Sequence, residues 1–176
     1  PLYRELTVIE YLQHCARLNQ LRGKQLKSAV ATVIERCGLG DVQRRLIGQL
    51  SKGYQQRTGI AQAIVHNPAV VIFDEPTSGL DPLQIRQIRE LIRELANEHS
   101  VILSTHILPE VEMLCDRVQI ISKGQVMFAD SLKALHQQRL NSSLKITLAA
   151  PPELNELETL MNVSTVEAVS ANQFRI

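Results

Sequence analysis

The feature that most restricts the fold is a pair of short apolar runs with one helix-length segment between them. The runs are AVVIFD, residues 69–74, and SVILST, residues 100–105, and the segment LQIRQIRELIRELANE separates them. A continuous apolar run bounded by polar residues is typical of a strand buried in a parallel sheet. Parallel strands need a crossover connection, and the amphipathic segment supplies a helix for it. The sequence therefore predicts a doubly wound α/β core.

The segments on either side of this core have different patterns. Thr7 and Glu10 have capping-box spacing, which predicts a helix from about Val8, and a second helix is expected from about Lys24 to Arg36. After the core, RVQIIS and QVMFAD predict a hairpin, and a helix is expected over residues 131–138. The last segment predicts a strand, a proline-led helix and two further strands. We expect a helical part at 1–50, an α/β core at 51–138 and a small α+β appendage at 139–176.

Composition excludes several classes of protein. The formal net charge of the 176 residues is only +1, which gives no electrostatic footprint for nucleic acid or for an acidic membrane surface. The three cysteines are widely spaced and form no paired motif, so we expect reduced thiols in the cytosol and no thiolate metal site. No apolar run approaches the roughly 18 residues that a membrane-spanning helix needs. Partners must therefore be inferred from individual sites.

Reactive side chains follow both apolar runs. Asp74 and Glu75 come at the end of the first run, and Thr105 and His106 at the end of the second. Ligands of open parallel sheets bind at the carboxyl ends of the strands, so these groups should share one rim. Since successive strand residues point to opposite faces, the two acids should diverge, which suits one carboxylate for a metal and one for water. The alternative is a pair of solvated loop acids next to a helix.

A second candidate site is the stretch LSKGYQQR, residues 50–57. Ser51 is a good N-cap, and Gly53 in the first helical turn leaves backbone N–H groups uncovered. Such a helix start can bind an anion through its free amides and its dipole. Simple capping by Ser51, with no ligand, is the alternative.

Together, LSKGYQQR, VVIFDEPTSGLDP and LSTH resemble the signature motif, the Walker B motif with its D-loop and the switch-histidine loop of ABC-type ATPases. The resemblance extends from residue 1 to about residue 135. Two departures stand out. Lys52 and Tyr54 replace a glycine and the glutamine of the common L-S-G-G-Q signature, a form similar to one sub-group of ABC exporters. No G-x-x-x-x-G-K-[ST] phosphate loop occurs in the chain, and the Q-loop glutamine is also missing.

The resemblance implies a role for each matching residue. Asp74 would hold Mg²⁺ through water, Glu75 would polarise the attacking water, and His106 would contact the γ-phosphate. Asp81 matches the D-loop aspartate, which lies across a dimer interface. The signature residues would contact the ATP held by a second subunit, and they are Ser51, Lys52, Gly53, Tyr54 and Gln55. Lys52 could equally be a solvated lysine at a helix start.

The resemblance also implies a function and partners. The chain is expected to be the C-terminal portion of the ATP-binding subunit of an ABC transporter, which hydrolyses ATP in a head-to-tail dimer. Its partners would be a second ATP-binding subunit and a membrane-spanning permease, which would hold it at the inner face of the membrane. The chain alone should hydrolyse ATP negligibly. The alternatives are a soluble ABC ATPase acting in translation or DNA repair, and a non-catalytic interaction module.

Two further groups of residues receive structural interpretations. We interpret Arg86, Arg89 and Arg93 as a solvated helix face. Four histidines show no metal-ligand spacing and are interpreted as surface or satisfied residues, namely His14, His66, His99 and His136.

Overall fold

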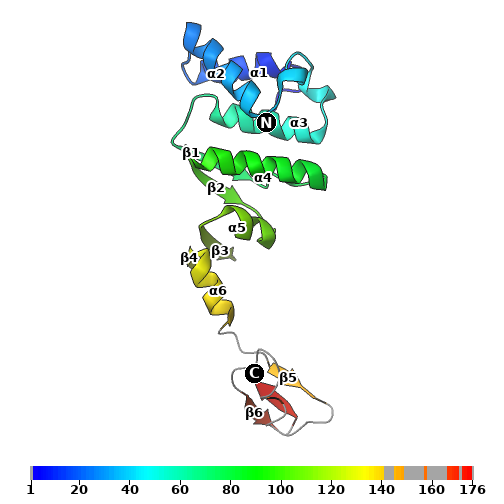
Figure 1. Ribbon diagram of the computed structural model, residues 1–176, viewed down its shortest axis with the longest axis vertical. Coiled ribbons are helices and arrows are strands. Elements are labelled where there is room, and N and C mark those ends of the chain that lie inside the picture. Colours follow the sequence, from blue (N-terminus) through cyan, green and yellow to red (C-terminus); the bar gives the residue numbers. More distant parts are fainter. Residues whose placement is uncertain (1, 141–144, 149–156, 158–165, 171, 176) are drawn as a thin grey trace. The chain divides into compact units, whose positions relative to one another are not determined.

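The computed structural model describes residues 2–140, 145–148, 157, 166–170 and 172–175 (Figure 1). Two compact units divide the chain, Pro1–Cys115 and Asp116–Ile176, and each is described here by itself. The expected boundaries near residues 50 and 138 stay predictions.

The first unit begins with helices whose ends follow the local sequence. Helix α1, Val8–Leu18, begins after Thr7, and Thr7 and Glu10 form the predicted reciprocal capping box. Helix α2, Gly23–Arg36, is followed by Gly38 at φ +63°, a conformation that favours glycine. Two short 3₁₀ turns, η1 at Gly40–Val42 and η2 at Ile47–Gln49, lead to helix α3, Lys52–Ile64. The predicted N-terminal helices are confirmed.

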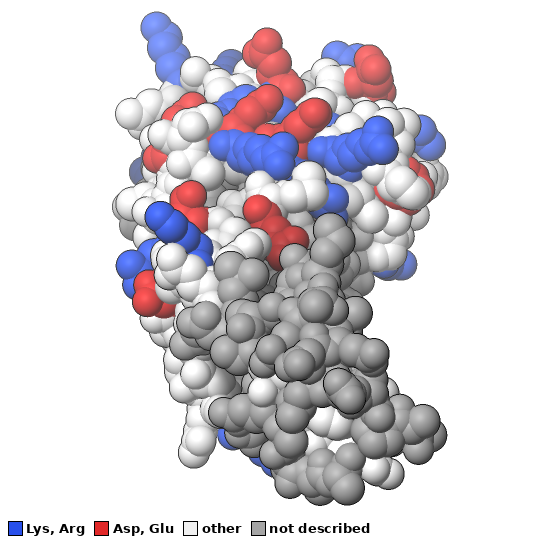
Figure 2. Space-filling view, turned by 60° about the horizontal axis from the view of Figure 1, so that its bottom comes forward, with Lys and Arg blue, Asp and Glu red and all other residues white. Residues whose placement is uncertain are grey.

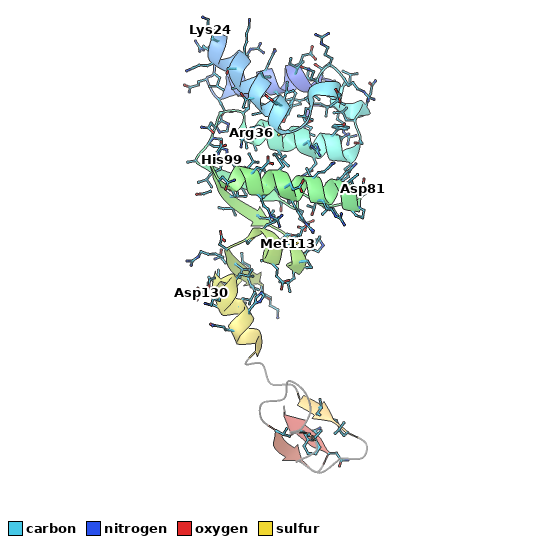
Figure 3. All side chains as sticks on the ribbon, in the orientation of Figure 1. Lys24, Arg36, Asp81, His99, Met113 and Asp130 are labelled. Atoms are coloured by element: carbon cyan, nitrogen blue, oxygen red, sulfur yellow. The ribbon has the colours of Figure 1, made fainter. Side chains whose placement is uncertain are left out.

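The α/β part of this unit has the predicted parallel pairing. Strand β1, Val70–Asp74, pairs in parallel with β2, Ser100–Ser104. Helix α4, Pro82–Ala96, is the crossover between them, and helix α5, Leu108–Leu114, follows β2. Asp81 lies at the N-terminal end of α4, and His99 lies beyond its other end (Figure 3). The carboxyl ends of both strands therefore lie at one edge, as expected.

Within the first unit, the described residues cover only one face of this strand pair. Val71 and Phe73 are buried, with 3% and 6% exposure, whereas Val70 and Ile72 are 51% and 67% exposed. Ile102 of β2 is also exposed. The prediction of buried strands is therefore wrong for alternate residues within the first unit, because helices pack on one side of the pair and no described residue of this unit covers the other.

One apolar core joins the helical part to the strands. It runs from α1 and α2 through α3 to β1 and α4, without a break near residue 50. Helix α3 lies between the α1–α2 pair and the layer formed by α4 and the strands (Figure 1). Completely or almost completely buried members come from each of these elements, among them Val8, Leu12, Val30, Ile60, Val71, Ile88 and Leu95. The start of α3 is thus rigidly placed against α4.

The second unit opens with the predicted hairpin. Strands β3, Arg117–Ser122, and β4, Gln125–Ser131, are antiparallel and meet at Lys123 and Gly124. Both turn residues have positive φ, 49° and 76°, as a type I′ turn requires. Helix α6, Leu132–Leu140, follows where a helix was predicted.

A three-stranded antiparallel sheet occupies the last part of the second unit. Its strands are β5 at Lys145–Thr147, β6 at Glu167–Ser170 and β7 at Gln173–Arg175, in the order β5-β7-β6. The predicted proline-led helix lies outside the described residues apart from Leu157, which is helical. No helix in the described ranges has the length and apolar character needed to cross a membrane.

Candidate functional site

The two strand ends meet at a polar rim. Asp74 is paired with Ser104 in the sheet register, and the Ser104 hydroxyl donates a hydrogen bond to Oδ1 of Asp74. The backbone N–H of Glu75 donates to the Ser104 carbonyl, 2.9 Å away. The loop after β1 is therefore fixed to the end of β2 by both backbone and side-chain bonds.

Glu75 and His106 form a contact across this rim. Nδ1 of His106 lies 2.7 Å from Oε1 of Glu75, and because a carboxylate only accepts, the imidazole is the donor. Both side chains are solvent-accessible, with 73% exposure for His106 and 44% for Glu75. Glu75 has φ +44°, a left-handed conformation that is uncommon for non-glycine residues and marks a constrained site. The two acids have different partners, Ser104 for Asp74 and His106 for Glu75.

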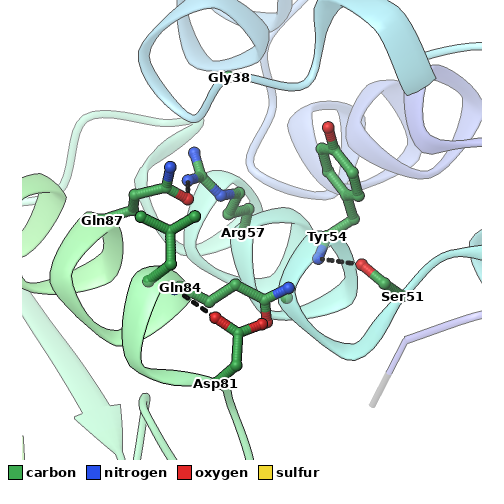
Figure 4. Close-up of a pocket in the computed structure, with 9 residues that line it drawn as sticks. Gly38, Ser51, Tyr54, Arg57, Asp81, Gln84 and Gln87 are labelled. Carbon is green, nitrogen blue, oxygen red and sulfur yellow. Dashed lines mark hydrogen bonds between the residues drawn. The ribbon is translucent and has the colours of Figure 1, made fainter.

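The signature stretch opens on a cavity at the start of α3. Ser51 is the N-cap, and its Oγ accepts from the Tyr54 N–H at 3.4 Å. A cavity of about 350 Å³ lies beside this cap, between α3 and the start of α4 (Figure 4). Its walls include four of the predicted site residues, namely Ser51, Gly53, Tyr54 and Asp81, together with Gly38, Arg57, Leu83, Gln84 and Gln87. The structure thus brings three of the five predicted signature residues, Ser51, Gly53 and Tyr54, together with Asp81.

Gly53 has a packing reason to be glycine. A Cβ at this position would lie 2.5 Å from Oε1 of Gln84 and 2.6 Å from its Cδ. The backbone N–H of Gln84 donates to Oδ1 of Asp81 at 2.9 Å. The absent side chain at Gly53 thus leaves room for the amide at the flexible end of the Gln84 side chain.

Lys52 and Gln55 do not line this cavity. The Lys52 side chain lies over Gly79, with Nζ where a Cβ of Gly79 would be. The Gln55 amide donates to the carbonyls of Ile47 at 3.2 Å and Leu50 at 3.0 Å. In this arrangement Lys52 contacts the loop before α4, and Gln55 secures the turn that leads into α3.

Sequence reasoning missed a buried carboxylate behind the rim. Glu110 of α5 is completely buried, and its Oε1 accepts from Oγ1 of Thr77 at 2.5 Å and from Nη2 of Arg89 at 3.1 Å. Its Oε2 accepts from Oγ1 of Thr105 at 2.8 Å. Burial raises the pKa of Glu110, but the hydrogen bonds from the two threonines and Arg89 outweigh it, so the net pKa lies below the ordinary 4.5.

The interpretation of the arginines as a solvated face is wrong for Arg89, which is largely buried and pairs with Glu110. Arg86 and Arg93 are exposed, and Arg93 also donates from Nη2 to the Met113 carbonyl at 3.1 Å. Helix α5 covers this side of α4, which an isolated helical pattern could not show. Arg89 and Arg93 therefore join α4 to α5.

His99 also differs from its interpretation. It is buried, with Nδ1 2.7 Å from the Pro68 carbonyl, which makes Nδ1 the donor. Its Nε2 is buried without a partner, so the ring is only half satisfied. His99 precedes β2 and its partner Pro68 precedes β1, so this contact joins the segments that lead into the two strands. The polar rim lies at the other end of the strands.

The rim has the donor chemistry that Mg²⁺ prefers. Mg²⁺ is usually bound through one or two carboxylates and keeps several water ligands. Asp74 offers one accessible carboxylate with the Ser104 hydroxyl beside it. Within the described ranges, no three histidine, cysteine or acidic side chains cluster as a complete metal cage. The residues fit a water-mediated Mg²⁺ contact better than a direct protein cage.

Comparisons with known proteins agree with this geometry. The ABC transporter family model matches residues 2–78. The chain is 38% identical over 144 residues to the ABC transporter ATP-binding protein NatA of Bacillus subtilis, covering 81% of this chain and 58% of NatA. It is 42% identical over 127 residues to the bacitracin transport ATP-binding protein BcrA of Bacillus licheniformis, covering 71% of this chain and 40% of BcrA. The chain spans about half the length of the curated relatives it matches.

A solved structure shares the fold. It is cbiO1 from Clostridium perfringens, part of the ABC transporter complex cbiONQ, with a TM-score of 0.69 and 28% identity over 78% of this chain and 55% of cbiO1. The parallel strand pair with its crossover helix places the chain in the α/β fold class that cbiO1 represents. Within that class, the chain belongs to the family of ABC transporter ATP-binding proteins.

Proposed function

We propose that this chain is part of an ATP-hydrolysing subunit of an ABC transporter. The observation that carries the proposal is the rim at the ends of β1 and β2, where Nδ1 of His106 lies 2.7 Å from Oε1 of Glu75 and Asp74 bonds to Ser104. Phosphoryl transfer needs positioning and charge neutralisation more than covalent chemistry, and a rim of fixed acids with one histidine suits that need.

Each rim residue has a distinct proposed role. Asp74 holds Mg²⁺ through water, and that ion, when bound, neutralises phosphate charge. Glu75 orients the attacking water and accepts hydrogen bonds from it, while His106 holds Glu75 and lies ready to contact the terminal phosphate. Asp74 and Glu75 contact different partners, Ser104 and His106, which suits two separate tasks.

The second part of the proposal concerns partners. Ser51, Lys52, Gly53, Tyr54 and Gln55 belong to the proposed contact with ATP held by a second ATP-binding subunit, and Asp81 to the subunit interface. The shared cavity of Ser51, Gly53, Tyr54 and Asp81 supports a single contact surface for these groups. A membrane permease is the proposed partner, as cbiO1 is part of a transporter complex. The L-S-K-G-Y signature favours an exporter, held at the inner face of the membrane.

Glu75→Gln in the natural full-length protein tests the proposed role of the rim. We expect hydrolysis of ATP to fall by roughly 100-fold or more, because the amide cannot accept a proton, while ATP binding is kept. Glu94→Gln, an exposed acid on α4, is the matched control and should leave the rate unchanged. Steady-state phosphate release and equilibrium binding of ATP provide the two readouts. Equal activity of Glu75→Gln and wild type would contradict the proposal.

The 176-residue chain alone is expected to release phosphate only at background rate. The chain contains no G-x-x-x-x-G-K-[ST] loop to cradle the phosphates. Robust turnover by the purified chain, abolished by Glu75→Gln, would contradict this expectation.

A further inference from the structure

Glu110 connects the two loops that carry the rim residues. Thr77 lies two positions after Glu75 in the loop that follows β1, and Thr105 immediately precedes His106 in the loop that follows β2. One carboxylate accepts from both hydroxyls, at 2.5 Å from Thr77 and 2.8 Å from Thr105. Glu110 thus links the loop that carries Glu75 to the loop that carries His106, and we call this set of hydrogen bonds the bridge.

Two members of the bridge are buried and one is half-buried. Glu110 is completely buried and Thr77 is 4% exposed, so water cannot substitute for a lost Thr77 hydroxyl, whereas Thr105 is half-buried. The third donor, Arg89, comes from α4 and supplies the compensating charge at 3.1 Å. A buried carboxylate is stable only when paired and hydrogen-bonded, and this one is held from three separate segments.

Thr105 extends the bridge to the backbone beside His106. Its Oγ1 donates to Glu110 and also accepts from the N–H of Ile107 at 3.1 Å. The residues on both sides of His106 are thus oriented by the same hydroxyl. A change at Glu110 or Thr77 should reach His106 through Thr105.

We propose that Glu110 is a positioning residue that holds Glu75 and His106 at their mutual distance, through Thr77 and Thr105. Its consequence for ATP hydrolysis rests on the proposed function above. The coupling of the two loops by Glu110 does not rest on the proposed function, because it concerns only how the loops are held together.

The first arm of the test measures ATP hydrolysis by the natural full-length protein. For Thr105→Val we expect kcat to fall about tenfold, since small misplacements of positioned groups are costly, with KM for ATP within about twofold of wild type. Thr105→Ser keeps the hydroxyl and should restore most of kcat. Thr58→Val removes a buried hydroxyl that bonds only within α3, at the Tyr54 carbonyl, and is the matched control for loss of packing or solubility. Loss of kcat that Ser does not rescue would overturn the positioning role.

The second arm needs no activity. Hydrogen exchange of backbone amides is followed by mass spectrometry in wild type, Thr77→Val, Glu110→Gln and the exposed control Glu112→Gln. We expect Thr77→Val and Glu110→Gln to speed exchange in residues 105–107, although Thr77 lies in the other loop. Faster exchange confined to residues 75–81 in Thr77→Val would overturn the bridge. Coupled exchange in a protein that does not hydrolyse ATP would support the bridge and reject the proposed function.

Discussion

At the residue scale, the space around Gly53 distinguishes it from Gly59 on the same helix. A Cβ at Gly53 would meet the Gln84 amide at 2.5 Å, whereas nothing lies within 4 Å of one at Gly59. Gly59→Ala should therefore raise the free energy of unfolding by about 0.5–1 kcal/mol through helix propensity. Gly53→Ala should raise it by less, because the Gln84 amide must first move out of the space that the new Cβ takes. Urea unfolding of both variants measures this, and an equal gain at both positions would contradict the close approach.

The ionisation of Glu110 makes its contribution to stability depend on pH. Its folded pKa lies below the ordinary 4.5, so its contribution is fully present above pH 4.5 and is lost as the pH falls through the folded pKa. Glu110→Gln should thus lower the free energy of unfolding by roughly 1–3 kcal/mol at neutral pH, as for hydrogen bonds to charged groups. The difference from wild type should shrink in acid. Urea unfolding across pH measures it, with Glu112→Gln as control, and a difference that grows in acid would contradict the assignment.

At the element scale, strand β1 alternates between a packed and an open face. Phe73→Ala should cost about 3–5 kcal/mol, because Phe73 belongs to the core. Ile72→Ala, at a residue 67% exposed, should change the free energy of unfolding of this chain by less than about 0.5 kcal/mol. Chemical denaturation of the two variants tests the alternation. A large cost for Ile72→Ala would show that this face is covered in solution.

The same elements show what the sequence could and could not predict. The start of α1 depends on Thr7 and Glu10, three residues apart, so a local pattern was sufficient. The shared rim followed from two strand endings and the rules of parallel sheets. The open face of β1 was missed because its residues are as apolar as the buried ones. Glu110 was missed because two of its three donors, Thr77 and Arg89, are distant in the sequence, and only the fold brings them to it.

At the scale of the whole molecule, basic and acidic side chains nearly balance, with 19 lysines and arginines against 18 aspartates and glutamates. The near-neutral total of +1 agrees with the mixture of basic and acidic side chains on the described part of the face in Figure 2. A continuous basic surface is what phosphate-backbone binding would need. The proposed recognition of ATP therefore depends on a few fixed groups at the rim and at the start of α3, not on the overall field of the protein.

The division into two units leads to a prediction about folding. The apolar core from Val8 to Leu95 lies entirely within Pro1–Cys115, and so do the Glu110 bridge and the rim. A chain of residues 1–115 should therefore fold alone, since a core of this length is sufficient for a small domain. Circular dichroism should show one cooperative thermal transition, with a midpoint within about 5 °C of the main transition of the 176-residue chain. The buried-core variant Phe73→Ala should lower the midpoint in both chains alike. A piece that melts without cooperativity would show that the first unit needs the second for its stability.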